Sequence, residues 1–363
     1  MVDAVSFEKL RDMLLASGCA AVGVAGVEPF IETRSAIEQR KSSQMHGEMH
    51  FTFGDPERST DVRRSFPWAE SLLVAGYAYL PDAGSPEGGR ANHGRVARFA
   101  TWDHYEPLRS ALRNAAIALS DNGHRAELVV DDNRLVDRAA AVRAGLGWWG
   151  KNTMVLSPAS GPWMLLGSVV TEARLKPTEP MVRDCGTCSA CLPACPTGAL
   201  VEPGVLDARR CLAHLLQAKG WIPRELRKAS GDRIYGCDDC LDACPPGNKL
   251  LQIGPPAPRH DLLELLELSD DELLARFEHF YVPRRRAAYL RRNVLVAIGN
   301  SGDGAARRPL LEYLGSADPM LRAHAAWALG ELGLGRAEMA VAAESEANDH
   351  VRREIEAALA ASA

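Results

Sequence analysis

Two spacings of hydrophobic residues alternate along the first half of the chain. Apolar residues at helical spacing, among them Phe7, Leu10 and Leu14, predict a helix near residues 6–17. Further helices are expected near 108–120 and 135–144, and short apolar runs typical of strands lie at 20–24, 72–79, 127–130 and 163–171. Strands interspersed with helices favour a layered α/β core over an all-β sandwich.

The pattern changes twice toward the C-terminus. Residues 176–254 hold all the clustered cysteines, many prolines and glycines and few periodic segments, which indicates a module organised by metals. After a linker at 254–258, the pattern is helical to the end. We therefore expect a multidomain α/β protein with domains at 1–175, 176–254 and 255–363, and a surface loop at 81–89.

The last of these domains carries a weak internal repeat. Segments starting at Leu290, Leu321 and Val351 align with one another, with a period of about 30 residues and apolar positions on one helix face. Such a period predicts a short HEAT-like stack of helix pairs. An ordinary three-helix bundle is the alternative that the pattern leaves open.

Composition and charge limit the class of protein. The 363 residues are 46% hydrophobic and 25% charged, as in ordinary globular proteins, and the net charge of -5 argues against wholesale coating of nucleic acid. A local basic patch is still compatible with RNA binding. No signal peptide is visible, and the apolar runs are about half the ~20 residues that span a bilayer. We expect a soluble, cytoplasmic protein without membrane contact.

Eight of the nine cysteines follow a pattern with a specific chemistry. The first run is CxxCxxCxxxCP at 185–196, the second is CxxCxxxCP at 237–245, and Cys211 lies between them. In the bacterial ferredoxin signature, three close thiolates hold one [4Fe–4S] cluster and the fourth cysteine ligates the other. This rule predicts two interleaved clusters, one on Cys185, Cys188, Cys191 and Cys244 and the other on Cys195, Cys211, Cys237 and Cys240.

Other uses of these cysteines fit the pattern less well. A zinc site normally uses two CxxC pairs or adds histidines, and disulfides are rare in a reducing compartment. Cys19, in an apolar stretch far from the others, is predicted to be a buried core thiol. The GxGxxG match at 145–150 follows a helical stretch and not a strand, so no dinucleotide site is expected there.

Several further segments carry a family signal. They are Val130-Asp131, Asp137-Arg138, AGLGWWGKN at 144–152, Arg210-Cys211, GDRIYGCDDC at 231–240 and RRNVLVAIG at 291–299. Together they resemble the cobalamin-dependent epoxyqueuosine reductases of tRNA modification, relatives of the reductive dehalogenases, over nearly the whole chain. The resemblance implies an N-terminal α/β cobalamin-binding domain, a ferredoxin-like module whose near cluster reduces the cobalt, and C-terminal helical repeats that help hold the tRNA anticodon arm.

The chain departs from the family's commoner motifs in three places. It has VDDNR at 130–134 where many members have VDSAP, AHLLQA at 213–218 where they have SYLTIE, and WDHY at 102–105 where they have RDYH. Asp131 is kept. The second departure puts the cobalamin contacts expected near 213–218 in doubt.

The resemblance assigns Asp131 as proton donor, since turning an epoxide into an alkene needs two electrons and proton delivery to the departing oxygen. Partial burial at the mouth of a strand would raise the pKa of this carboxyl; a polar turn that closes the strand is the alternative. Glycines at 145, 147 and 150 would let the backbone approach a macrocycle, unless they form a packed turn. The expected cobalamin contacts are Arg98, Asp131, Gly150, Lys151, Asn152, His214 and Gln217.

A basic tract lies near the start of the last domain. Pro283 suits the first turn of a helix, on which Arg284, Arg285, Arg291 and Arg292 share about a third of the circumference. We predict that this arginine stripe faces outward and contacts RNA phosphates, with a merely solvated helix face as the alternative. Tyr281 and Tyr289 are expected either to stack on unpaired bases or to pack between helices.

These features predict an oxidoreductase that reduces epoxyqueuosine at the wobble position of tRNA, the last step of queuosine biosynthesis. The expected partners are a tRNA anticodon stem-loop and an external low-potential electron donor, and the chain is expected to act as a monomer. A reductive dehalogenase-like enzyme of a small molecule would share the cofactors but should lack the helical tail. A non-catalytic ferredoxin would not need about 175 residues of α/β structure before its clusters.

Overall fold

The computed structural model describes residues 6–80, 92–251 and 258–361. The expected loop at 81–89 and nearly all of the expected linker at 254–258 lie outside these residues. The chain divides into two compact units, one made of Met1–Gly84, Trp102–Arg209 and Asp239–Pro255, the other of Ser85–Thr101, Arg210–Asp238 and Pro256–Ala363. This grouping differs from three consecutive domains, because each unit takes part of the cysteine-rich segment. No helix among the described residues is long and apolar enough to cross a membrane.

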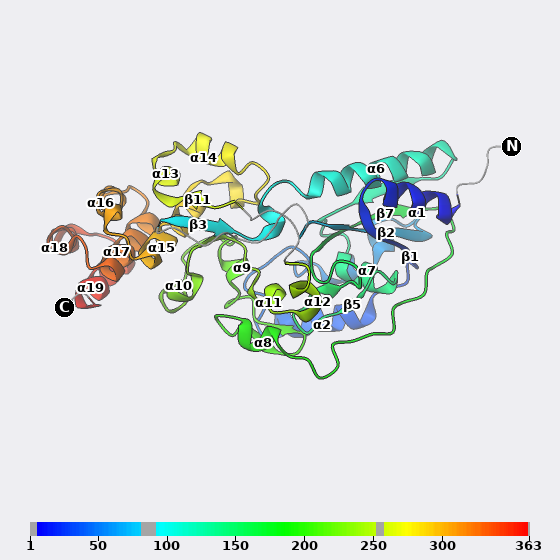
Figure 1. Cartoon of the computed structure of the whole chain (residues 1–363), viewed down its shortest axis with the longest axis horizontal. Coiled ribbons are helices and arrows are strands. Elements are labelled where there is room, and N and C mark those ends of the chain that lie inside the picture. The colour runs from blue at the N-terminus through cyan, green and yellow to red at the C-terminus, as the bar shows by residue number, and fades with distance from the viewer. Residues whose placement is uncertain (1–5, 81–91, 252–257, 362–363) are drawn as a thin grey trace. The chain divides into compact units, whose positions relative to one another are not determined.

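The core of the first unit is an antiparallel four-stranded sheet with helices on both faces (Figure 1). The strand order is β1-β2-β7-β4, with bounds Cys19–Ala25, Ser71–Ala78, Met164–Thr171 and Ala126–Val129. These strands occupy the four predicted apolar runs. Leu72 and Val74 pack in the same core as Ala140 of helix α7, and Leu73, which points to the opposite face, is also fully buried. The runs are continuously apolar because both faces of the sheet are covered.

Helices and short strands complete the first unit. The predicted helices are present as α1 (Phe7–Ala16), α6 (Tyr105–Asp121) and α7 (Asp137–Arg143). Cys19 is buried, as predicted, and burial raises the pKa of its thiol to about 11. The other elements are α2 (Ile31–Ser42), α3 (Pro56–Thr60), α4 (Val62–Ser65), β5 (Trp148–Trp149), β6 (Val155–Leu156), α8 (Cys191–Ala194), β8 (Leu200–Glu202), β9 (Val205–Leu206), α11 (Asp239–Asp242) and α12 (Pro245–Asn248).

The second unit joins a small sheet to a stack of helices. Its sheet has the order β10-β3-β11, with bounds Arg233–Tyr235, His93–Val96 and His260–Asp261. The shorter helical elements are η1 (Arg98–Ala100), α9 (Leu212–Leu215), α10 (Arg224–Ser230), α13 (Leu262–Glu267), α14 (Asp270–Arg276), η2 (Pro283–Arg285) and η3 (Gly304–Ala306). The stack consists of α15 (Ala288–Ser301), α16 (Arg307–Leu314), α17 (Pro319–Leu332), α18 (Arg336–Ser345) and α19 (Asp349–Ala361), coloured from orange to red in Figure 1.

The predicted repeat corresponds to helices α15, α17 and α19. Helix α17 packs against both of the others, and two glycines at the same place in the first two copies permit the close approach. A Cβ at Gly299 would lie 2.6 Å from Trp327, and one at Gly330 would lie 2.7 Å from the Cβ of Ala358. The third copy has Ala360 at this place, where no further repeat helix follows among the described residues. The helix-pair stack is therefore confirmed over the three-helix bundle.

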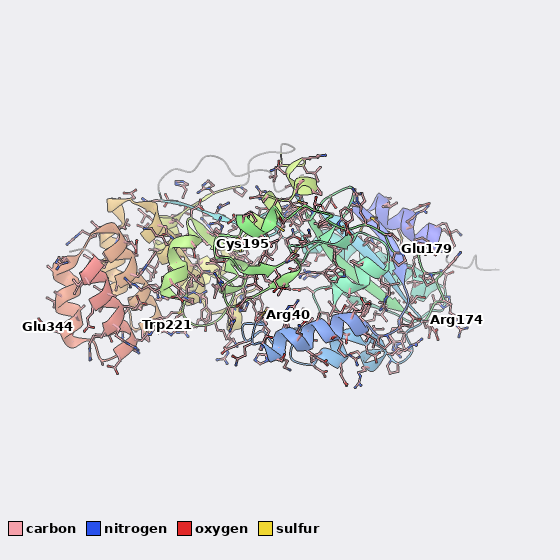
Figure 2. All side chains as sticks on the ribbon, turned by 90° about the horizontal axis from the view of Figure 1, so that it is seen from below. Arg40, Arg174, Glu179, Cys195, Trp221 and Glu344 are labelled. Atoms are coloured by element: carbon pink, nitrogen blue, oxygen red, sulfur yellow. The ribbon has the colours of Figure 1, made fainter. Side chains whose placement is uncertain are left out.

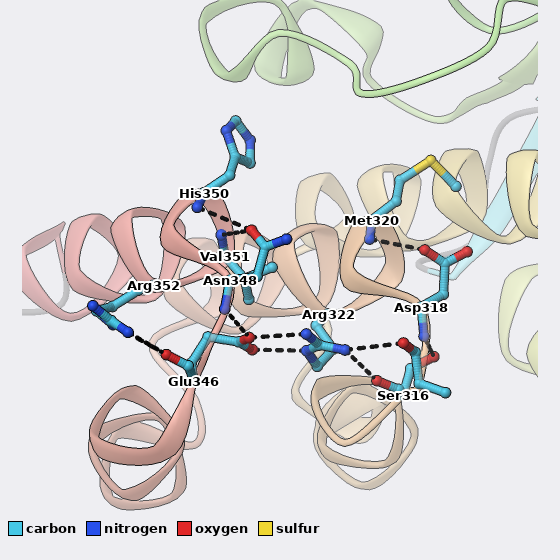
Figure 3. Close-up of polar contacts among 10 residues, drawn as sticks. Ser316, Asp318, Met320, Arg322, Glu346, Asn348, His350, Val351 and Arg352 are labelled. Atoms are coloured by element: carbon cyan, nitrogen blue, oxygen red, sulfur yellow. Dashed lines mark hydrogen bonds and ion pairs between the residues drawn. The ribbon is translucent and has the colours of Figure 1, made fainter.

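Polar contacts fix the connection between two repeats (Figure 3). Arg322 on α17 donates two hydrogen bonds to the carboxylate of Glu346, at 2.7 and 2.8 Å, and a third to the carbonyl oxygen of Ser316. A guanidinium and a carboxylate joined by two hydrogen bonds are fixed in relative orientation as well as in separation. Trp221, labelled in Figure 2, stacks on His324 of α17 and also contacts His350 of α19.

Candidate functional site

Asp131 lies just beyond the end of strand β4, at the strand mouth expected from the sequence. Its φ of 50° is in the left-handed region, which is costly for residues other than glycine. Burial raises the pKa of its carboxyl, and the nearby charge of Asp132 adds to this effect, while Arg109 and Arg138 oppose it. The side chain of Asp131 is exposed on one side. The upward shift of its pKa therefore comes from protein atoms packed around part of the carboxyl, which is not fully enclosed. Asp131 is thus biased toward its protonated form.

The adjacent carboxyl of Asp132 is biased the other way. Arg134 donates to both of its oxygens, with Nε 3.0 Å from each and Nη2 2.6 Å from Oδ2. Burial alone would raise the pKa of Asp132, but the hydrogen bonds from Arg134 outweigh it and hold the pKa below its ordinary value. Arg134 also donates to Glu127 on β4, at 2.6 Å, and its guanidinium lies over the ring of Phe66. The loop therefore holds two neighbouring carboxyls whose pKa values are shifted in opposite directions.

Two residues that the sequence reasoning did not single out as site residues are coupled to Asp131. Burial raises the pKa of Tyr105, at the start of α6, and the charges of Asp131 and Asp137 add to the effect. Burial also raises the pKa of Asp137 well above its ordinary value, again with a contribution from Asp131. We call Tyr105, Arg109, Asp131, Asp137 and Arg138 the Asp131 group. The available signal was the Asp137-Arg138 pair, which belongs to the family-like segments.

Four cysteines predicted to share one cluster lie near one another in the first unit. Cys191 begins α8 and is buried, Cys244 caps the N-terminus of α12 and is buried, and Cys188 is exposed. Burial raises the pKa of Cys244 to about 11, and the charges of Cys185, Cys191 and Cys188 add to it. The structure thus brings together the predicted ligands Cys185, Cys188, Cys191 and Cys244, although the last comes from the other motif. Among the described residues, no group of three or more His, Cys, Asp or Glu side chains has the geometry to hold a metal ion.

The predicted ligands of the second cluster are divided between the two units. Cys195, directly after α8 (Figure 2), and Cys240 on α11 belong to the first unit, whereas Cys211 and Cys237 belong to the second. The Sγ of Cys195 accepts a hydrogen bond from the amide of Ala199 at 3.2 Å. Burial would raise the pKa of Cys195, but hydrogen bonds from backbone and side-chain donors between 197 and 200 lower it. This environment favours a thiolate, the form that binds iron.

Lys151 and Asn152, predicted to contact cobalamin, donate hydrogen bonds to backbone carbonyl oxygens near the cysteines. The Nζ of Lys151 donates to the carbonyl oxygens of Gly186 and Cys188, at 2.7 Å each. The side-chain amide of Asn152 donates to the carbonyl oxygen of Cys240 at 3.4 Å. The ammonium group of Lys151 thus supports the loop of the exposed Cys188, and a cobalamin contact by Lys151 or Asn152 stays a prediction.

The glycines before Lys151 approach the protein's own chain. A Cβ at Gly145 would lie 2.3 Å from the carbonyl oxygen of Glu179, one at Gly147 would lie 2.2 Å from that of Leu156, and one at Gly150 would lie 2.5 Å from the Oδ1 of Asn152. Side chains are excluded at these places by internal packing. The packed-turn alternative therefore accounts for these glycines, and a cobalamin contact by Gly150 stays a prediction.

The remaining expected cobalamin contacts lie in the second unit. Arg98 is buried and donates to Asp238 from its backbone amide, at 2.8 Å, and from its guanidinium, at 3.3 Å. Gln217 accepts a hydrogen bond from the hydroxyl of Tyr235 at 3.1 Å. His214 lies on α9, partly buried. A cofactor contact by any of these residues stays a prediction.

Buried polar atoms provide a test of fit for a cofactor rich in amide groups. In the described part of the first unit, the Oγ of Ser160 and the Nε1 of Trp148 are buried and make no hydrogen bond. Unsatisfied groups of this kind are rare in native proteins unless a ligand or water completes them. The first unit therefore has donors that fit the amide side chains of a corrin.

The predicted outward-facing arginine stripe is wrong for two of its four members. Arg291 is 7% exposed and Arg292 is fully buried. Arg291 pairs with Asp270 at 2.9 Å, and Arg292 donates to the carbonyl oxygens of Leu215 and Ala218. Helix α15 is covered by α10, α13, α17 and β10, so the face that carries these arginines is an interior face.

Arg284 and Arg285 are exposed, but they precede the helix. Pro283 begins the short 3-10 turn η2 and not α15, and Arg284 and Arg285 have φ values of 54° and 50°. Tyr281 is 66% exposed, whereas Tyr289 is buried beneath the guanidinium of Arg292. The surface candidates for RNA contact are therefore Tyr281, Arg284 and Arg285.

Comparisons with known proteins agree with this arrangement. A family described as 4Fe-4S double cluster binding domain matches residues 184–247, and HEAT repeats match 284–360. Epoxyqueuosine reductase of Bacillus subtilis is 33% identical over 367 residues, covering 96% of this chain and 94% of the relative. The enzyme of Escherichia coli is 32% identical and covers 89% of each.

Solved structures resemble the chain over almost its full length. Epoxyqueuosine reductase with an epoxyqueuosine-modified tRNA-Tyr stem loop has a TM-score of 0.89 at 30% identity, covering 98% of each chain. The enzyme of Streptococcus thermophilus has a TM-score of 0.87 at 27% identity, covering 97% of this chain and 98% of that one. A structure of the Bacillus subtilis enzyme, with a TM-score of 0.88 at 30% identity and 98% coverage of each chain, has an aspartate catalytic loop swung out of its active site.

Proposed function

Because the chain belongs to the epoxyqueuosine reductase family, we propose that it reduces the epoxide of epoxyqueuosine in tRNA and leaves the alkene of queuosine. The observation that carries this proposal is the pair of differently tuned carboxyls, Asp131 and Asp132, at the end of β4. Epoxide reduction needs an acid that is still protonated near neutral pH, and the raised pKa of Asp131 suits that task.

The reaction balances with two electrons and two protons. Both carbon–oxygen bonds of the epoxide break, an alkene forms between the two carbons, and the oxygen leaves as water. Asp131 donates a proton to the departing oxygen, since a poor oxyanion leaving group is stabilised by protonation as its bond breaks. Asp132 stays ionised on Arg134 and keeps the loop in place.

The double cluster domain supplies the electrons one at a time from an external low-potential donor. The exposed position of Cys188 suits the cluster on Cys185, Cys188, Cys191 and Cys244 to receive them. Cys195, Cys211, Cys237 and Cys240 are proposed to hold the second cluster. Lys151 stabilises the loop of the first cluster through the carbonyl oxygens of Gly186 and Cys188.

Cobalamin is the proposed partner of these clusters, as the family resemblance implies, and when bound it supplies a strongly reducing cobalt centre. The buried donors of Ser160 and Trp148 are the proposed partners for its amide groups. The role of the chain's own residues is to bind this group, exclude water from it and hold the proton on Asp131.

The substrate is proposed to be the anticodon stem-loop of tRNA, the kind of ligand found with a relative that is 30% identical. Arg284 supplies a forked donor for a phosphate, and Arg285, which donates to the carbonyl oxygens of Glu278 and Leu274, adds positive charge beside it. The exposed ring of Tyr281 supplies a surface for an unpaired base. A small-molecule reductase would have no use for this arrangement or for the HEAT repeats.

Anaerobic turnover of a synthetic anticodon stem-loop that carries epoxyqueuosine tests the proposal. The protein, loaded with iron, sulfide and cobalamin and supplied with a chemical reductant, should convert the nucleoside to one lighter by a single oxygen atom. Protein loaded with clusters alone is the control. Dehalogenation of a bromophenol without any change in the stem-loop would instead favour the small-molecule alternative.

A further inference from the structure

The exposed ring of Tyr281 projects from a segment whose neighbouring residues are buried. Phe280 and Val282 are 4% and 5% exposed, whereas Tyr281 between them is 66% exposed. Side chains alternate in direction along an extended chain, so burial of the two neighbours turns the ring of Tyr281 toward solvent. The exposed Arg284 follows three residues later. An aromatic ring and a cation thus lie close together in the chain on the surface of the second unit.

The hydroxyl group of Tyr235 holds the backbone of Tyr281 through both its amide and its carbonyl group. The amide of Tyr281 donates to the hydroxyl oxygen at 2.9 Å, and the hydroxyl lies 3.2 Å from the carbonyl oxygen of the same residue. It also lies 3.1 Å from the Oε1 of Gln217, so its single proton is shared between two acceptors. Gln217 is itself fixed, because its Nε2 donates to the carbonyl oxygen of Ala213 at 2.8 Å.

The ring of Tyr235 holds the residue before Tyr281 as well. It stacks on the ring of Phe280, with centroids 3.9 Å apart and 20° between the planes, and Phe280 stacks on Phe277 at 4.6 Å. Tyr235 lies on β10, and its carbonyl oxygen accepts a hydrogen bond from the amide of Ala97, directly after β3, at 2.8 Å. Since Tyr235 is only 2% exposed, it anchors Tyr281 to the sheet from the interior of the second unit.

An exposed aromatic ring on a fixed backbone suits stacking on an unpaired base, because little conformational freedom is lost when the base binds. We propose that Tyr235 is a positioning residue that holds the ring of Tyr281 in place as a stacking surface for an unpaired base of the tRNA anticodon loop. Tyr235 acts through Tyr281 and does not touch the RNA. This inference rests on the proposed function, in which Tyr281 contacts the stem-loop.

Binding of a synthetic anticodon stem-loop to the cofactor-loaded protein tests the positioning role. Tyr281→Ala should weaken binding by about tenfold, the scale of one lost base stack. Tyr235→Phe keeps the buried ring but removes the hydroxyl group, and it should weaken binding by about threefold or more. In both variants the dependence of binding on salt should stay that of wild type, because no charge is removed, whereas Arg284→Ala should flatten it.

Tyr313→Phe is the matched control. It also removes a hydroxyl group that makes two hydrogen bonds in the second unit, since the hydroxyl of Tyr313 accepts from Arg291 and donates to the carbonyl oxygen of Leu266. This variant should bind the stem-loop like wild type. Once Tyr281 is alanine, adding Tyr235→Phe should weaken binding no further, because both residues act through one ring. Equal weakening by Tyr313→Phe, or the same loss from Tyr235→Phe with and without the ring of Tyr281, would overturn the proposal.

Hydrogen exchange tests the contact without RNA or turnover. The backbone amide of Tyr281 should exchange faster in Tyr235→Phe than in wild type or Tyr313→Phe, because its hydrogen-bond acceptor is gone. Equal exchange in all three proteins would show that the hydroxyl does not hold this backbone, and the proposal would be wrong. A wild-type protein that binds the stem-loop through Tyr281 but leaves the epoxide intact would refute the proposed reaction, while the positioning role of Tyr235 would stand.

Discussion

Arg134 donates hydrogen bonds to both carboxylate oxygens of Asp132, with Nη2 2.6 Å from Oδ2. Asp132 directly follows Asp131 in the sequence. The guanidinium is itself held by Glu127 on β4 and by the ring of Phe66. The loop between β4 and α7 thus contains one carboxylate that is paired with an arginine and one carboxyl that is not. This difference decides which of two adjacent aspartates is proposed to carry the transferable proton.

Asp131→Asn should lower turnover by about 10²-fold or more, the usual scale for a lost general acid. Asparagine tolerates the left-handed backbone of this position, so folding and iron content should be unchanged. Single-turnover assays with the modified stem-loop measure the effect. If this variant reduces the epoxide at a near-normal rate while Asp132→Asn or Asp103→Asn is inactive, the proton donor is that other aspartate and not Asp131.

Asp132→Asn should destabilise the protein in a pH-dependent way. The pKa of Asp132 is lowered in the folded state, so its contribution is fully present above the pKa of the unfolded chain, about 4, and disappears as the pH falls through the lower folded value. Thermal denaturation should show a gap between wild type and variant at neutral pH that closes in acid. A gap that is constant with pH would point to packing instead of charge.

Substitutions of single cysteines should damage the clusters in pairs that cross the two motifs. Cys185→Ala and Cys244→Ala should lose the same cluster, because these side chains lie together in the first unit. Cys195→Ala and Cys240→Ala should lose the other. Anaerobic iron counts with electron paramagnetic resonance distinguish the two losses. Spectra that group Cys195 with Cys185 would contradict the interleaved assignment.

Lys151→Met should weaken the first cluster and leave the second intact. It removes two hydrogen bonds to the loop of Cys188 and a positive charge near its thiolates, so the reduced cluster is less stabilised. Potentiometric titration should show a more negative potential for one cluster only. Lys176→Met, at an exposed position of the same unit, is the control. If Lys176→Met shifted the cluster potential as much as Lys151→Met, the hydrogen bonds of Lys151 would not be what stabilises the first cluster.

The four arginines of the basic tract should separate into two classes. Arg284→Ala with Arg285→Ala should weaken stem-loop binding and flatten its salt dependence, with iron and cobalt content unchanged. The loss of stability should be small, because only the exposed hydrogen bonds of Arg285 to the carbonyl oxygens of Glu278 and Leu274 are removed. Arg292→Met should instead destabilise the helical repeats by at least ~3 kcal/mol, because it leaves buried carbonyl oxygens without a donor. Binding measured across a salt series, with melting curves, tests both. If stem-loop binding by the wild-type protein did not depend on salt, Arg284 and Arg285 would face solvent without contacting RNA phosphates.

The sequence by itself determined the chemistry that depends on local spacing. The cysteine motifs predict two interleaved clusters, because a cubane needs several thiolates within a short reach of chain. The period of about 30 residues predicts the helix pairs now seen in α15, α17 and α19. The apolar runs at 20–24 and 72–79 predict strands, because a buried strand must be apolar on both faces.

Only the tertiary structure decided which helix faces are covered and which distant groups interact. A helical wheel shows that Arg291 and Arg292 share a face, but the helices packed on α15 make that face interior, and backbone carbonyl oxygens then satisfy the buried guanidinium of Arg292. Asp137 is six residues from Asp131 in the sequence, and its Oδ1 is buried without a hydrogen bond because of what packs around the start of α7. Burial and coupling of charges depend on what surrounds a side chain in space, and no local pattern in the sequence encodes that surrounding.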